Sequence, residues 1–208
     1  MRNQNVFKLT RTAILSAIAA ILFFIEIPVG VPFYKLDFSE IPALIGTFAF
    51  GPVAGIMIEF CKILLKLVVK GTSTAFVGDL ANFVVGCSFI LPASIIYTFK
   101  KTKKNAMIAS VTGTLIMTVF GTMFNAIYLL PTFATLYGMP LEAIIEMGTK
   151  INGNITSVTT LVLFAVAPLN LLKGGSVSLV TILVYKKLSP VLKAGTISKK
   201  ERTVETVK

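Results

Sequence analysis

Histidine and tryptophan are absent from the 208 residues, and only two cysteines are present. Without histidine, a Ser-His-Asp triad and nearly every common zinc site are excluded. Cys61 and Cys87 lie inside apolar runs, where we expect small core residues rather than a disulfide or a metal pair. The chain also lacks a G-x-x-x-x-G-K-[ST] phosphate loop, so we do not expect it to hydrolyse ATP. Carboxylates such as Glu26 and Glu59 are the remaining candidates for acid–base catalysis, which we do not favour.

Charge is also scarce, since only 14% of the residues are charged, 55% are hydrophobic and the mean hydropathy is +0.85. Soluble domains have about 25% charged residues, so this composition indicates a membrane protein. A signal peptide does not explain the apolar run that begins at Ala13, because no small-residue cleavage site follows it and further apolar runs do. The net charge of +11 comes from basic clusters beside apolar runs, which indicates membrane topology rather than nucleic-acid binding.

Apolar runs of about 20 residues predict membrane-spanning helices. We predict an all-α integral membrane protein with six transmembrane helices, at about 9–27, 39–50, 52–69, 80–99, 106–130 and 168–188. The second is short for a full crossing and could be tilted or partial. Pro168 suits the first position of the last helix, where its missing N–H loses no helical hydrogen bond. Residues 131–167 then form a long connection, with 155–167 as an interfacial or re-entrant segment; a seventh span there is the competing prediction.

The basic residues predict the orientation. Three lie in the first eleven residues, four in 100–104 and seven from Lys186 onward, which together make fourteen of the twenty. The positive-inside rule then places both termini in the cytoplasm. We therefore predict one six-helix membrane domain over residues 1–190 and a basic cytoplasmic tail over 191–208.

Four polar residues are predicted at membrane depth, all toward the outer side: Asn82, Asn125, Asn170 and Lys173. Polar groups are costly there and indicate function. Each asparagine alone is as well explained by contacts between helices as by a ligand. Lys173 could extend to the lipid headgroups or pair with a carboxylate such as Glu40. Convergence from three helices favours a binding site for a polar ligand.

The segment KLDFSEIP (35–42) gathers charges between two apolar runs, on the predicted outer face. Ser39 is a good N-cap for the second helix, and Glu40 then favours the positive end of the helix dipole. Capping leaves Lys35 and Asp37 unexplained, and we place both in an outward-facing loop.

Two further surface patterns are visible. Lys62, Lys66 and Lys70 recur every four residues, so they form one stripe on the third helix, which we expect to face water or headgroups rather than a ligand or partner. Ala13 and Ala17 give the first helix a flat surface of small residues. Such a surface suits close helix packing, either within the chain or against another membrane protein.

Three segments resemble the substrate-binding subunits (S components) of energy-coupling factor transporters, specifically their riboflavin-binding branch. They are LDFSEIPALIGTFAFGPVAG (36–55), GTSTAFVGDLANFVVG (71–86) and PLNLLKG (168–174). The similarity extends over residues 9–190.

The resemblance implies six transmembrane helices in the prokaryotic plasma membrane that bind riboflavin near the outer surface, with the first long loop as a lid. It also implies a transmembrane coupling protein, which Ala13 and Ala17 would contact, and two cytoplasmic ATPases; no other cofactor and no metal are implied. The riboflavin contacts implied by the family are Asn125, Asn170, Lys173, Asn82, Leu36 and Asp37. The alternatives are an S component for another vitamin, such as pantothenate or a thiamine precursor, and a stand-alone secondary transporter.

Overall fold

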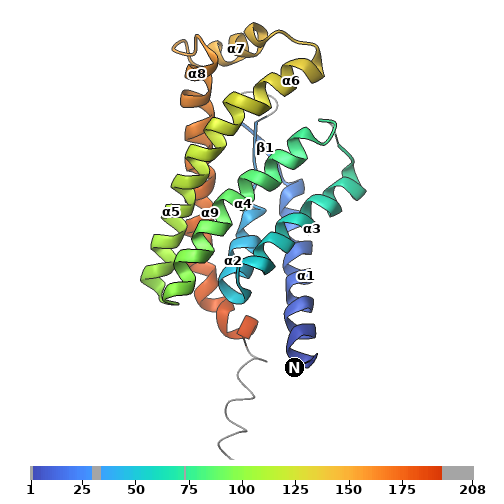
Figure 1. Cartoon of the computed structure of the whole chain (residues 1–208), viewed down its shortest axis with the longest axis vertical. Helices are drawn as coiled ribbons and strands as arrows, with labels where there is room; N and C mark the ends of the chain where they lie inside the picture. Colours follow the sequence, from blue (N-terminus) through green and yellow to red (C-terminus); the bar gives the residue numbers. More distant parts are fainter. Residues whose placement is uncertain (1, 30–33, 73, 194–208) are drawn as a thin grey trace, which may run out of the picture.

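The computed structural model describes residues 2–29, 34–72 and 74–193, which are almost entirely helical (Figure 1). The helical elements in chain order are α1 (Arg2–Phe24), α2 (Glu40–Phe50), α3 (Pro52–Lys70), α4 (Val77–Phe99), α5 (Lys103–Phe124), the π-helical η1 (Asn125–Leu129), α6 (Leu130–Tyr137), α7 (Leu141–Thr149), α8 (Val158–Leu161), the π-helical η2 (Val162–Val166) and α9 (Ala167–Lys193). Two short antiparallel strands, β1 (Ile27–Pro28) and β2 (Lys35–Leu36), connect α1 to α2.

Four of the described helices are long and apolar enough to cross a membrane. They are Gln4–Phe24, Val77–Phe99, Lys103–Tyr137 and Val158–Tyr185. The predicted second and third spans also form helices, α2 and α3, on either side of Gly51, whose φ of 99° is a conformation that glycine adopts without a Cβ clash. However, α2 has 11 residues and α3 contains four charged ones. Length and composition therefore identify four crossings, and six remain a prediction.

The predicted connection at 131–167 is wrong at both ends. The fifth helix continues through η1 and α6 to Tyr137, and the last helix begins at Val158 rather than at Pro168. Pro168 thus lies inside a continuous helix, two residues after the end of the π-helical turn η2. A π-helical turn shifts the backbone hydrogen bonds from i−4 to i−5 and so interrupts the regular α-helical pattern. Proline is tolerated beside such an interruption because it has no N–H to donate. No separate re-entrant segment or seventh span forms among the described residues of this region; α7 lies in the connection.

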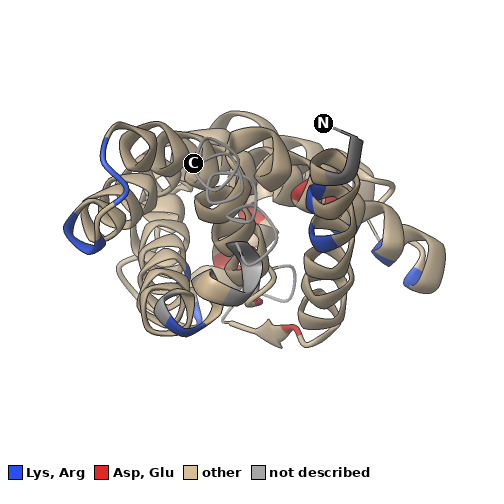
Figure 2. Cartoon of the chain, turned by 90° about the horizontal axis from the view of Figure 1, so that it is seen from below, with Lys and Arg blue, Asp and Glu red and all other residues tan. Residues whose placement is uncertain are grey.

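The bundle has two main apolar clusters, at different heights along its long axis. The first fills the half nearer the N-terminus and includes the buried Phe48, Phe89 and Met117. The second lies at the opposite end, where α6, α7 and α8 meet (Figure 1), and includes Leu130 and Ile144. Six of the described charged residues are buried, namely Asp37, Glu40, Glu59, Lys62, Lys66 and Asp79. Seen from below, basic positions lie toward both sides of the bundle, and several acidic positions lie toward its middle (Figure 2).

Candidate ligand-binding site

Two neighbouring cavities open between the apolar clusters. The larger has a volume of about 430 Å³ and the smaller about 130 Å³. Lys35, Gly78 and Asn82 line both cavities, so they adjoin each other. The larger cavity alone falls in the range of about 300–1,000 Å³ that is typical of small-molecule sites.

The smaller cavity is where the predicted polar residues meet. Asn82 from α4, Asn125 from the start of η1, and Asn170 and Lys173 from α9 all line it. The predicted convergence of three helices is therefore what the structure shows. Leu129 and Val166, which lie in the two π-helical turns, line it too. Such turns often occur at functional sites.

Two of these asparagines have buried amide atoms without a hydrogen-bond partner among the described residues, Nδ2 of Asn170 and Oδ1 of Asn82. Buried polar groups are nearly always paired, so this donor and this acceptor are available to a polar ligand in the cavity. Asn125 is different, because its Nδ2 donates to the Gly121 carbonyl at 2.8 Å and its Oδ1 accepts from the Tyr34 hydroxyl at 3.1 Å. Its Nδ2 retains one further N–H.

Lys173 forms ion pairs with two carboxylates. Its Nζ lies 2.9 Å from Oδ2 of Asp37 and 2.8 Å from Oε1 of Glu40. Pairing with Glu40, one of the alternatives from the sequence, is therefore present. Burial alone would raise the pKa of Asp37, but the ammonium groups of Lys173 and Lys62 lower it to about 2. Asp37 consequently stays ionised at neutral pH and neutralises part of the lysine charge.

The predictions for the segment 35–42 need two corrections. Asp37 is only 2% exposed and lines the larger cavity, so it is not in an outward-facing loop. Ser39 occupies the N-cap position, but its hydroxyl does not cap the helix. Instead it donates to Oδ1 of Asp37 and accepts from Nζ of Lys62 at 2.8 Å. Neither backbone group that a cap would serve is available, because the Ile41 N–H already donates to the Phe38 carbonyl at 3.1 Å and Pro42 has no N–H.

The lysine stripe on α3 does not face water as predicted. Lys62 is fully buried and Lys66 is 8% exposed; only Lys70 is largely accessible. Each buried lysine pairs with an acid, Lys62 with Glu59 at 2.7 Å and Lys66 with Asp79. The stripe therefore faces the interior, and the unfavourable burial of its charges is offset by these partners.

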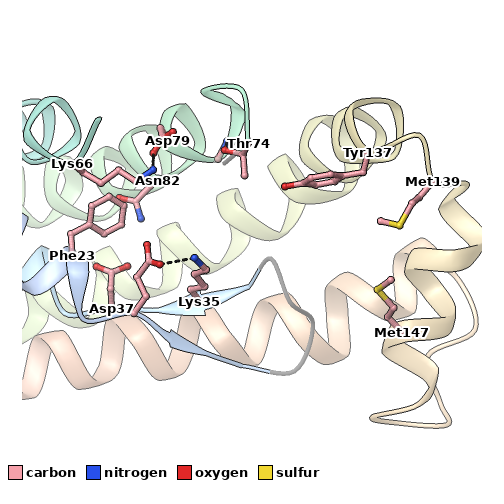
Figure 3. Close-up of a pocket in the computed structure, with 12 residues that line it drawn as sticks. Phe23, Lys35, Asp37, Lys66, Thr74, Asp79, Asn82, Tyr137, Met139 and Met147 are labelled. Atoms are coloured by element: carbon pink, nitrogen blue, oxygen red, sulfur yellow. Dashed lines mark hydrogen bonds and ion pairs between the residues drawn. The ribbon is translucent and has the colours of Figure 1, made fainter. Parts of the chain in front are cut away.

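The larger cavity has walls of unlike chemistry (Figure 3). One side carries ion pairs, Lys66 with Asp79 and Lys35 with Glu26. The other side is formed by Tyr137, Met139 and Met147, which come from the end of α6, the following turn and α7. An amphipathic molecule with one polar and one apolar part would match this arrangement.

The remaining predicted residues lie elsewhere. Leu36 is buried in β2 and lines neither cavity. Ala13 and Ala17 are exposed on α1, in line with the exposed Ile14 and Ile18, so they do not pack inside the chain.

Several site residues were not predicted from the sequence, above all Tyr34, Lys66 and Asp79, which line the cavities. The sequence did contain a signal for Lys66 and Asp79, since both are charged residues within or beside apolar helices. Such charges require buried partners or a polar cavity.

Comparison with known proteins identifies the family of this chain. Residues 7–185 match the family model described as ECF transporter, substrate-specific component. This chain belongs to that family. A solved structure of the S component of a bacterial ECF transporter superposes with a TM-score of 0.70 at 36% identity, covering 93% of this chain and 99% of the other.

Curated relatives of this S component include two riboflavin transporters. Riboflavin transporter RibU of Staphylococcus aureus (strain TCH60) is 36% identical, over 91% of this chain and 94% of the relative. Riboflavin transporter FmnP of Bacillus subtilis (strain 168) is 32% identical, over 90% and 94%. Together with the apolar helices, the family establishes the chain as a multi-pass protein of the cell membrane.

Proposed function

We propose that this S component binds riboflavin in the two adjoining cavities, as the membrane subunit of an energy-coupling factor uptake transporter. The observation that carries the proposal is the unpaired amide donor of Asn170 beside the unpaired acceptor of Asn82, on residues that line one cavity with Lys173. The names of the curated relatives support the choice of riboflavin.

The chemistry of riboflavin suits this site. The pyrimidine edge of its isoalloxazine ring alternates hydrogen-bond donors and acceptors, and an asparagine amide can pair with both. Lys173 can donate to a ring carbonyl or a ribityl hydroxyl. The dimethylbenzene end is flat and apolar, so it requires walls such as those that Tyr137, Met139 and Met147 provide. Asn125 can contribute its remaining N–H, and Asp37 can accept from a hydroxyl.

We further propose six membrane crossings with both termini in the cytoplasm. The distribution of basic residues supports this topology, because the N-terminal residues and the segment 100–104 lie at the same end of the bundle (Figure 1). In this topology α2 and α3 complete the six, and the cavities lie toward the outer side. The membrane domain is assigned to 1–190; most of the basic tail assigned to 191–208 lies outside the described residues.

The chain itself supplies binding, while ATP hydrolysis belongs to partner subunits. The S-component family supports this division, since such subunits serve within ECF complexes. We assign the exposed surface around Ala13 and Ala17 to a transmembrane coupling subunit, itself joined to two cytoplasmic ATPases. Small side chains let a partner helix approach closely, which suits docking inside a membrane.

The test is a fluorescence titration of the purified, ligand-stripped protein with riboflavin, followed by competition with pantothenate and thiamine. We expect one riboflavin per chain to be quenched at submicromolar concentration, with no competition from the other vitamins. A folded protein that leaves the fluorescence of riboflavin unchanged would overturn the assignment and favour another vitamin. Uptake by this chain alone, abolished by an uncoupler, would instead support a secondary transporter.

A further inference from the structure

Four buried residues and the partly buried Lys173 close a ring of hydrogen bonds and ion pairs beside the cavities. The carboxylate of Asp37 accepts from Lys173 with one oxygen and from Ser39 with the other. Oε1 of Glu40 lies 2.8 Å from Nζ of Lys173 and 3.2 Å from Nζ of Lys62. Lys62 completes the ring by donating to Ser39 at 2.8 Å. We call these five residues the buried ring.

The buried ring joins segments that are distant in the chain. Asp37 follows β2, Ser39 and Glu40 begin α2, Lys62 lies on α3 and Lys173 lies on α9, 136 positions from Asp37. Two members also line the cavities, Asp37 the larger and Lys173 the smaller. The ring is therefore continuous with the candidate site.

Lys62 is a member of the buried ring that lies away from the cavities. It is fully buried and lines neither cavity, so it cannot contact a molecule bound there. Yet its ammonium has three neighbours within 3.2 Å, namely Ser39, Glu40 and, outside the ring, Glu59. Two of its N–H groups donate to Ser39 and Glu40, and the ion pair with Glu59 adds a third contact that fixes its position.

The ring determines what Lys173 can offer to a ligand. Of its three N–H groups, one is directed to Asp37 and one to Glu40, which leaves one for a ligand in the smaller cavity. If Lys62 were absent, Glu40 would lose its second cation and would draw Lys173 toward itself. Ser39 would also lose the donor that holds its hydroxyl toward Asp37.

We propose that Lys62 is a positioning residue for substrate binding, which acts through Glu40 and Ser39 to hold the ammonium of Lys173 and the carboxylate of Asp37 in place at the cavities. This inference rests on the proposed function. Its physical basis is that a buried ion-pair network has its members fixed by one another, so the loss of one displaces the rest.

A double-mutant cycle with riboflavin titration tests this role. We expect Lys62→Gln to weaken riboflavin binding at least tenfold in the wild-type background. In the Lys173→Ala background the same substitution should change the affinity less than twofold, because the group that Lys62 positions is gone. An equal loss in both backgrounds, or an unchanged affinity of folded Lys62→Gln, would overturn the proposal.

A matched control separates positioning from general destabilisation. Ile63 is the buried neighbour of Lys62 on α3 and belongs to neither the ring nor the cavities. We expect Ile63→Ala to lower the melting temperature and to leave the affinity unchanged in both backgrounds. If Ile63→Ala reproduces the tenfold loss, the effect of Lys62 is structural and the proposal fails.

If Lys62→Gln does not fold, a second variant that removes no charge tests the same role. Ser39→Ala removes the link between Lys62 and Asp37 without changing the charge. We expect a loss of about threefold in the wild-type background and none in the Lys173→Ala background; additive effects would refute the ring. Failure of wild-type protein to bind riboflavin refutes the proposed function instead, so the two failures are distinguishable.

Discussion

Two interior regions are filled in opposite ways. One is the half of the bundle nearer the N-terminus, and the other is the charged region beside the cavities. The first excludes water with close-packed apolar side chains such as Phe48, Phe89 and Ile90. The second buries charged groups such as Glu59, Lys62 and Lys66, each with a partner of opposite sign. Apolar packing stabilises the fold, whereas buried ion pairs contribute little net stability because desolvation offsets their attraction.

The difference indicates that the apolar region stabilises the fold and that the charged region has another role. The charged region contributes little to stability, and it adjoins the cavities where polar groups would bind a ligand. We therefore expect substitutions in the apolar cluster to change stability and substitutions beside the cavities to change affinity. Four predictions test this expectation, beginning with the largest effect.

Replacing a buried residue of the apolar cluster should affect stability alone. Phe89 is fully buried, and Phe89→Ala should lower the free energy of unfolding by about 3–5 kcal/mol because it leaves a cavity. Thermal unfolding in detergent, combined with riboflavin titration of the folded fraction, measures both quantities. A parallel loss of affinity would show that the two regions are not independent.

Removing the lysine at the cavity should affect affinity and, to a smaller degree, stability. Lys173→Ala should weaken riboflavin binding by about 2 kcal/mol or more, roughly 30-fold, since a buried charged donor is lost. It also leaves Asp37 and Glu40 without one of their cations, so the melting temperature should fall. Unchanged affinity in the folded variant would remove Lys173 from the binding site.

Replacing an unpaired amide should lower the affinity for riboflavin without lowering the stability of the ligand-free protein. Asn170→Leu should weaken riboflavin binding by about 1 kcal/mol, roughly fivefold. The ligand-free protein should be as stable as the wild type or more so, because the buried Nδ2 lacks a partner there. Titration and thermal unfolding of the same preparation decide this; a destabilised ligand-free variant would mean that Asn170 has a structural role.

The smallest effect on both quantities is expected at the exposed face of α1. The double substitution Ala13→Leu and Ala17→Leu should leave affinity and melting temperature unchanged, since both side chains are exposed. It should abolish co-purification with the coupling subunit and riboflavin uptake by cells. Intact assembly would assign this surface to lipid contact instead.

The sequence sufficed to predict helices that depend on local chemistry. The break between α2 and α3 follows from Gly51 and Pro52, whose backbone preferences act at their own positions. By contrast, the start of the last helix was misplaced by ten residues, because Pro168 suits both a helix start and a helix interrupted by a π-helical turn. Only packing against the fifth helix and the second apolar cluster distinguishes these cases.

Composition and spacing alone determined that this is a helical membrane protein, that Lys62, Lys66 and Lys70 share one face of a helix, and that a few amides and Lys173 interrupt apolar runs. These properties depend on hydropathy and on the helical period. The tertiary structure decided that the lysine face points inward and which carboxylate each buried lysine meets. Such pairings join residues up to 136 positions apart, and no local pattern specifies them.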